Sequence, residues 1–142
     1  MERPILYVQL DLGNGRRLHA INVHLKSKIR TDIPGQKIDN FTWRTADAWA
    51  EGSFISSMKR MSQALEVRRL VDRILEAEPA ARIIVAGDFN ATPEEVPVKT
   101  IRGDVEDTGN TELARRDLGA DRAHASRVGQ VHPLSPRPWP DA

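Results

Sequence analysis

The chain contains no cysteine and no excess of either charge, and these two absences exclude several classes of protein. Without cysteine there is no disulfide framework, no thiolate nucleophile and no cysteine-ligated zinc, and the chain suits either redox compartment. The 21 basic side chains are balanced by 20 acidic ones, so this is not a polycation that coats nucleic acid by charge alone. Any attraction to phosphate must come from a local cluster of groups.

Long apolar runs are also missing. No stretch approaches the ~18 residues needed to span a membrane. The opening Met1-Glu2-Arg3-Pro4 is not followed by an uncharged apolar stretch that ends in small residues, so we expect no signal peptide. We therefore expect no membrane span and, by default, a cytoplasmic location. What is present is 142 residues, 39% of them hydrophobic, which is enough for one ordinary domain with a real core.

The first 25 residues predict a β-hairpin. Apolar and polar side chains alternate over 6–12, and Asn14-Gly15 suits a tight turn. A second strand is expected from about Arg17 to Leu25. Its even-numbered face changes from apolar to polar and ends in His24, as in a strand that delivers side chains to the rim of a sheet.

An irregular connection and a long amphipathic helix follow. From Lys26 to Ser53 there is no periodicity, and loops of this length are often functional. Ser53 is expected to cap the helix and Pro79 to stop it. We expect aromatic residues to pack the connection against the core, and an apolar stripe to pack the helix against it. These residues are Phe41, Trp43 and Trp49 for the connection and Met58, Met61, Leu65, Leu70, Ile74 and Leu75 for the helix.

The segment after the helix is the most informative. The apolar run within 82–86 predicts a strand buried on both faces, and it breaks into Gly87-Asp88-Phe89-Asn90. Asp88 and Asn90 are two residues apart, so we expect them to project to one side while Phe89 returns to the core. A carboxylate and a carboxamide can bind a hard cation or orient a water. The same residue types are also common in turns, so the motif alone is not specific.

Other polar residues acquire meaning only in combination with that motif. A lone histidine is usually structural, but His24 with Asp88 and Asn90 would complete an acid/base and phosphate-binding set. Lys26 and Lys28 would add positive charge, although surface lysines are ordinarily solvated. Beyond the motif, the stretch 92–95 has capping-box chemistry, and Pro97 predicts that this element is only a short turn.

The composition changes near residue 121. We interpret 1–120 as one domain and 121–142 as a separate tail, which holds four prolines, two histidines and no apolar periodicity. Such a segment cannot repay its ordering entropy, so we expect it to be disordered.

Two motifs in this order carry a family resemblance. Ile21-Asn22-Val23-His24-Leu25-Lys26-Ser27-Lys28 is followed, across a long loop and a helix, by Ile84-Val85-Ala86-Gly87-Asp88-Phe89-Asn90-Ala91-Thr92-Pro93. The pair resembles the endonuclease/exonuclease/phosphatase superfamily, the pancreatic-deoxyribonuclease-like metal-dependent phosphoesterases. The resemblance covers about 3–110.

The resemblance implies an α/β fold, part of a four-layer αββα sandwich, and hydrolysis of a phosphodiester or phosphomonoester with Mg²⁺ or Mn²⁺. By similarity, His24 contacts the scissile phosphate and assists the leaving oxygen, and Asp88 positions or deprotonates the attacking water. Asn90 would bind a phosphate oxygen together with Lys26 and Ser27, and Asp88 and Asn90 would be metal ligands. The substrate could be DNA, RNA, a nucleotide, a phosphoinositide or a phospholipid, because fold does not fix function. We expect the loop over 29–52 to shape that choice.

The departures from the family pattern are as important. The family begins with a strand bearing an Asn and a Gln-Glu motif whose Glu holds the metal, and it ends with an Asp-His motif. Here the chain starts after both the Asn and the Gln-Glu motif. His124 and His132 lie in the tail, and neither directly follows an Asp. Read one nucleotide on, the codons for 136–141 can encode a stretch similar to the one before the family's last strand. A frameshift and a natural disordered tail therefore both remain as explanations.

Three functional interpretations follow. The first is a metal-dependent phosphodiesterase or nuclease module that is incomplete, and therefore weak or inactive alone. The second is a catalytically inactive fragment that binds phosphate-rich ligands or pairs with a chain supplying the missing half. The third is an unrelated α/β domain in which the Gly-Asp-Phe-Asn motif is only a turn, which the order of the two motifs disfavours. For an incomplete sandwich we also expect marginal stability and self-association through an exposed sheet face.

Overall fold

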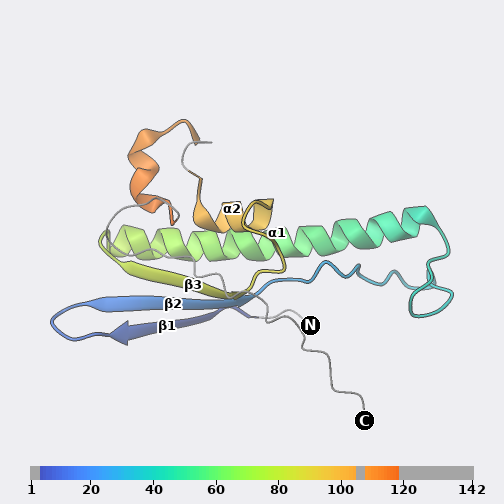
Figure 1. The fold of residues 1–142 in the computed structure, drawn as a ribbon, viewed down its shortest axis with the longest axis horizontal. Coiled ribbons are helices and arrows are strands. Elements are labelled where there is room, and N and C mark those ends of the chain that lie inside the picture. The colour runs from blue at the N-terminus through green and yellow to red at the C-terminus, as the bar shows by residue number, and fades with distance from the viewer. Residues whose placement is uncertain (1–3, 105–107, 119–142) are drawn as a thin grey trace, which may run out of the picture.

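Three strands form a small mixed sheet in the order β1-β2-β3 (Figure 1). The structure is a computed structural model and describes residues 4–104 and 108–118. β1 (Leu6–Asp11) pairs antiparallel with β2 (Arg17–His24) through the predicted hairpin turn, where Asn14 and Gly15 both have positive φ. β3 (Arg82–Asp88) pairs parallel with β2, so the carboxyl ends of these two strands lie at the same edge.

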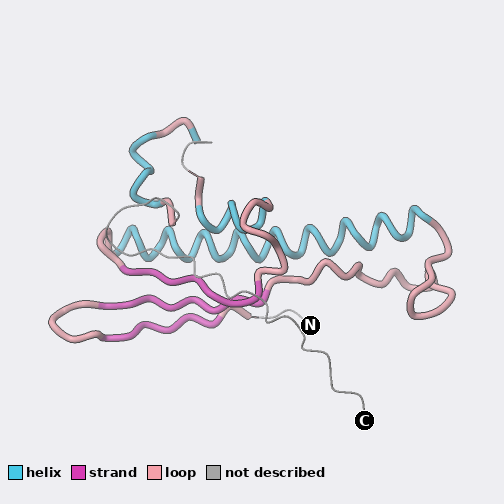
Figure 2. Tube along the Cα trace, viewed as in Figure 1, coloured by secondary structure: helices cyan, strands magenta, loops and turns pink. Residues whose placement is uncertain are grey.

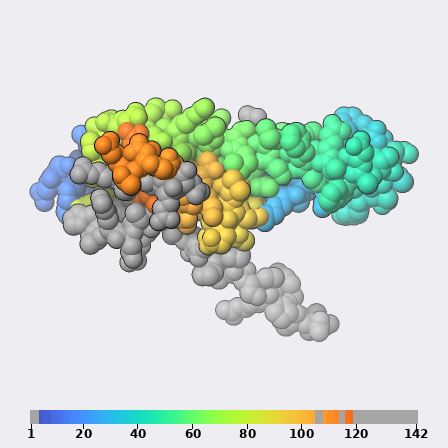
Figure 3. Space-filling view, turned by 90° about the horizontal axis from the view of Figure 1, so that it is seen from above, coloured from blue at the N-terminus to red at the C-terminus, as the bar shows by residue number. Residues whose placement is uncertain are grey.

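One long helix and two short ones accompany the sheet. α1 (Ala46–Ala77) crosses from β2 back to the start of β3, and α2 (Val96–Arg102) packs on one flank of α1. The 3₁₀ helix η2 (Thr111–Arg116) lies on the same side (Figure 3). The described part of the chain is thus a mixed α/β structure, as expected. None of its helices is long and apolar enough to cross a membrane.

The core lies between α1 and one face of the sheet. Alternate residues of β2 and β3 turn toward the helix, and the helix supplies small and β-branched side chains that fit between them. The buried members on the strands are Ile21, Val23, Ile83 and Val85, and those on α1 are Ala64, Val67, Val71 and Ile74. Phe89 also packs against this cluster, as the sequence predicts.

The described part of the chain leaves the opposite face of the sheet open. Leu6, Val8 and Leu10 of β1 are 59%, 41% and 44% exposed, and Ile84 of β3 is 38% exposed. The register places these side chains in rows across the three strands. We call this surface the open face; it comprises Leu6, Val8 and Leu10 of β1, Leu18, Ala20, Asn22 and His24 of β2, and Arg82, Ile84, Ala86 and Asp88 of β3. No described helix packs on it.

α1 extends well past the sheet. A helix of 32 residues is ~48 Å long, whereas the eight residues of β2 span ~26 Å. The overhanging amino-terminal half of α1 is accompanied by the connection from β2, which runs beside it (Figure 2). We call residues 29–44 together with residues 46–57 of α1 the arm. Inside the arm, the Thr31 amide donates to the Gly52 carbonyl at 3.0 Å, and the Ser56 hydroxyl donates to the Ile29 carbonyl at 2.8 Å.

The start of α1 differs from the prediction. The helix begins at Ala46 with Thr45 as its cap, and the Thr45 hydroxyl accepts a hydrogen bond from the Ala48 amide. Ser53 is inside the helix, where its hydroxyl donates to the Trp49 carbonyl. The end of the helix, two residues before Pro79, agrees with the prediction.

The predicted apolar stripe of α1 is partly wrong. Ile74 is buried and Leu70 and Leu75 pack against the core, but Met58 and Leu65 are 51% and 41% exposed. The inward positions of the first half of the helix are instead Ala48, Gly52 and Ser56. A Cβ on Gly52 would lie 2.5 Å from the Thr31 carbonyl oxygen and 2.9 Å from the Trp43 ring, so small residues are needed where the arm closes on the helix.

Three further expectations are corrected. β3 is buried on the α1 face only, because Ile84 lies on the open face. Pro97 occupies the first turn of a real helix, where its missing amide costs no hydrogen bond. Phe41 does not pack the connection against the core, since it is 92% exposed. The second strand agrees with the prediction to within one residue, since it ends at His24. The predicted disorder of 121–142 concerns residues outside the described ranges.

Candidate functional site

His24 and Asp88 lie side by side at the carboxyl ends of β2 and β3. The parallel register makes them direct partners, although they are far apart in the chain. His24 Nε2 lies 3.6 Å from Asp88 Oδ2, and the two side chains are 50% and 59% exposed. An imidazole and a carboxylate at this distance form an ion pair when the ring is protonated, and both remain open to a ligand.

Gly87 allows the two strands to approach at this point. Its φ is +130°, and a Cβ there would lie 2.0 Å from the Val23 carbonyl oxygen. The same Cβ would lie 2.7 Å from Asn22 Oδ1, so the Asn22 side chain occupies the space beside the glycine. Asn22 was not among the predicted site residues. The sequence does indicate Asn22, because alternation along the strand places it on the same face as His24.

Asn90 acts mainly as a brace for the turn after β3. Its backbone, at φ +47°, donates to Asp88 Oδ1 at 2.9 Å, and its side-chain Nδ2 donates to the Leu25 carbonyl at 3.0 Å. The first bond fixes the Asp88 carboxylate, and the second ties the turn to the end of β2. Asn90 is therefore next to the His24–Asp88 pair, with its amide nitrogen committed to the backbone.

Lys26 and Ser27 are held by α1 and by their own loop. The Lys26 ammonium donates to the Ile29 carbonyl at 2.7 Å and to the Ser27 hydroxyl at 3.3 Å, and its backbone amide donates to Gln63 at 2.6 Å. Arg60 donates to the carbonyls of Lys26 and Ser27. These hydrogen bonds give the segment a structural role beside its predicted phosphate contact. Arg60 and Gln63 were not among the predicted site residues, because their contacts depend on where the loop after β2 meets α1.

An ion pair links the two segments that flank the site. Lys28 forms an ion pair with Glu95 at 2.8 Å, and Glu95 also accepts a hydrogen bond from the Thr92 amide at 2.6 Å. The Lys28 hydrogen bond, followed by the Thr92 amide, lowers the pKa of the Glu95 carboxyl below its ordinary value. The loop after β2 and the turn after β3 are thereby joined.

The capacity of this site for a metal is limited. Within residues 4–104 and 108–118, no three His, Cys, Asp or Glu side chains gather in a way that could hold an ion. Mg²⁺ in phosphate-processing sites is often held by one or two carboxylates, with water and substrate completing the octahedron. Asp88 and the amide oxygen of Asn90 suit that smaller role.

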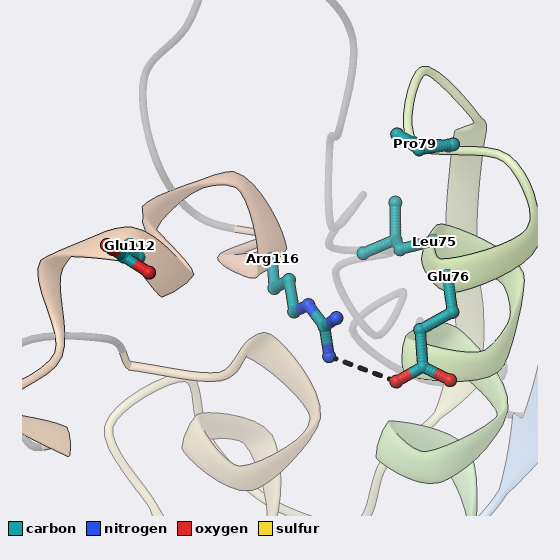
Figure 4. Close-up of a pocket in the computed structure, with 5 residues that line it drawn as sticks. All are labelled: Leu75, Glu76, Pro79, Glu112 and Arg116. Atoms are coloured by element: carbon teal, nitrogen blue, oxygen red, sulfur yellow. Dashed lines mark hydrogen bonds and ion pairs between the residues drawn. The ribbon is translucent and has the colours of Figure 1, made fainter.

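A separate hollow lies at the other end of β3. It is lined by Leu75, Glu76, Pro79, Glu112 and Arg116, between the end of α1 and η2, and has a volume of about 290 Å³ (Figure 4). Arg116 and Glu76 close one side with an ion pair at 3.3 Å. None of the predicted site residues lines this hollow.

No family model matches the chain, and neither the curated proteins nor the solved structures yield a match. The candidate site is therefore defined by the arrangement of His24, Asp88 and Asn90 alone.

Proposed function

We propose that this chain is part of a metal-dependent phosphoester hydrolase of the endonuclease/exonuclease/phosphatase type. The sheet and α1 would form two layers of its αββα sandwich. One observation carries the proposal: the parallel register of β2 and β3 sets His24 and Asp88 together at the carboxyl edge of the sheet. Open α/β sheets commonly bind ligands at this edge.

The close approach of the two side chains constrains how they would act. In phosphoryl transfer the attacking and leaving oxygens are roughly in line on opposite sides of phosphorus. Groups 3.6 Å apart cannot serve those two positions at once. The observed pair is therefore the resting arrangement. In the complex with substrate, a phosphate takes the place of Asp88 beside His24, and a water between phosphorus and Asp88 takes the place of His24.

In that complex the two residues divide the proton transfers. Asp88 accepts a proton from water as the water oxygen bonds to phosphorus. His24, protonated, gives its proton to the leaving oxygen as the phosphorus–oxygen bond breaks. A bound Mg²⁺ or Mn²⁺, held by Asp88 and the Asn90 amide oxygen, would stabilise charge on the phosphoryl oxygens.

Metal-dependent hydrolysis of bis(p-nitrophenyl) phosphate tests the activity. With Mg²⁺ or Mn²⁺ we expect slow turnover that Asp88→Asn and His24→Gln abolish, while Lys59→Gln on the outer surface of α1 leaves it unchanged. Circular dichroism confirms that each variant is folded. Turnover that survives Asp88→Asn would refute the assigned role.

Metal binding is tested separately from turnover. Mn²⁺ should broaden the amide resonances of Asp88 and Asn90 selectively, and Asp88→Asn should remove the effect. Uniform broadening across the chain contradicts a site at this position.

A non-catalytic role is the second candidate. It is favoured because, within the described ranges, no three His, Cys, Asp or Glu side chains gather in a way that could hold an ion. In that case inorganic phosphate shifts the His24 ring resonances and His24→Gln removes binding, but no variant or metal ion changes the hydrolysis rate from background.

A further inference from the structure

The open face combines an apolar centre with charges of opposite sign at its two ends. Of its four cross-strand rows, the second is Val8, Ala20 and Ile84 and the third is Leu6, Asn22 and Ala86. Val8 and Ile84 are 41% and 38% exposed, although β-branched residues in a sheet normally pack against another layer. Exposed apolar patches of a few hundred Å² are often sites of contact with another molecule.

The charges lie at opposite ends of β3. Arg82, at its start, and Asp88, at its end, share the open face because they are separated by an even number of residues. Arg82 pairs across the sheet with Leu18, and Asp88 pairs with His24. The face is therefore cationic at one end, apolar in the middle, and carries a carboxylate at the other end.

This pattern is self-complementary under two-fold symmetry. A two-fold axis that lies across the strands near Val85 stacks β3 on the antiparallel β3 of a second copy. It then sets Arg82 of each copy opposite Asp88 of the other. The row of Val8, Ala20 and Ile84 lies opposite the other copy's row of Leu6, Asn22 and Ala86, so Asn22 is the one polar side chain of these two middle rows. Two sheets pack face to face ~10 Å apart with strands nearly aligned, and an isologous contact repeats each pairing twice.

We propose that the open face is a homodimer interface, in which a second copy of this chain supplies the covering sheet. The tail of the same chain is a poorer occupant, because 121–142 contains no apolar alternation to match the strands. Taking the proposed function as well, the interface would bring the partner's Arg82 beside the His24–Asp88 pair. An arginine there suits bidentate binding of a phosphate.

The small size of the face indicates a weak dimer. Three strands ~4.8 Å apart and about 20 Å long give a footprint on the order of 300 Å². Standard interfaces bury ~800 Å² on each partner, so this dimer belongs to the small, reversible class. Association must therefore be measured over a concentration series.

Sedimentation velocity from low to high micromolar concentration is the test. We expect the weight-average mass to rise from one chain toward two, and Ile84→Lys to keep the chain monomeric. Met58→Lys is the matched control, since Met58 is also an exposed apolar residue, on α1 and away from the open face. Both variants replace exposed side chains, so folding should be retained and can be verified by circular dichroism.

Charge reversal tests the orientation. Arg82→Asp and Asp88→Arg should each weaken the dimer about tenfold, and the double variant should restore it, because the pair is exchanged across the interface. A monomer at all concentrations refutes the proposal. Loss of association in Met58→Lys, or its retention in Ile84→Lys, assigns the contact to another surface and also refutes it. None of these readouts depends on hydrolysis.

Discussion

Replacing Gly87 by alanine should separate the strands that carry the candidate site. The new Cβ would lie 2.0 Å from the carbonyl oxygen of Val23, a backbone atom that cannot turn aside. Ordinary contact at this position requires β2 and β3 to part by about 1 Å, which exceeds the slack of a ladder hydrogen bond. The φ of +130° adds strain, because L side chains rarely adopt it.

The expected cost follows from these two contributions. Backbone strain of this kind costs ~1–3 kcal/mol. Stretching the two or three neighbouring hydrogen bonds, including the one from the Leu25 amide to the Asp88 carbonyl, costs about 1 kcal/mol each. We expect Gly87→Ala to lose ~3–6 kcal/mol, a large fraction of the 5–15 kcal/mol typical of a domain.

Urea denaturation followed by circular dichroism measures this loss, and Gly15→Ala is its control. Gly15 also has positive φ, +70°, but a Cβ there meets nothing within 4 Å, so only the strain remains. The control should lose ~1 kcal/mol. If the two variants lose the same amount, the close approach of β2 and β3 at Gly87 is not as the structure has it.

Three further predictions concern packing and charge. Arg68 donates to three backbone carbonyls in and after α2 and is nearly buried, so Arg68→Ala should cost ~2–4 kcal/mol, measured by urea denaturation; a loss below 1 kcal/mol contradicts that role. Val67 is fully buried, so Val67→Ala should cost ~2 kcal/mol by the same assay, whereas Met58→Ala should be nearly neutral. Lys28→Ala should raise the pKa of Glu95 toward its ordinary value of 4.5, as read from its side-chain carboxyl resonance during an NMR titration. Because the folded pKa of Glu95 is lowered, its stabilising contribution exists above the ordinary value and is lost as pH falls, so wild type and Lys28→Ala should converge in acid; an unchanged pKa would show that the ion pair does not form in solution.

The elements with strong periodicity were predictable from the sequence. The hairpin over 6–24 follows from alternation and from Asn14-Gly15, and β3 follows from its apolar run. The start of α1 was not predictable in this way, because its first half is buried through Ala48, Gly52 and Ser56. Hydrophobic periodicity does not detect a helix that packs through small residues. It also predicted that Met58 is buried, whereas Met58 is exposed.

The candidate site was predictable only in part. Each motif could be placed at a strand end, but the contact between His24 and Asp88 depends on parallel pairing of strands separated by a long connection. Roles inside irregular segments were harder to predict. The hydrogen bonds of Lys26 and Asn90 depend on the path of the loop and on α1, and no local pattern encodes that path.

Because α1 extends past the sheet, the region around the sheet and the arm should differ in how cooperatively they unfold. Around the sheet, unfolding exposes a continuous set of buried aliphatic side chains, whereas the arm is held chiefly by hydrogen bonds, by Ala48 and by Arg30 against Trp49. Segments with few buried apolar contacts open without global unfolding. Amide hydrogens in the arm should therefore exchange by local opening, and those of β2 only with the whole fold. The connection that follows His24 can thus change shape while the strands that hold His24 and Asp88 stay in register.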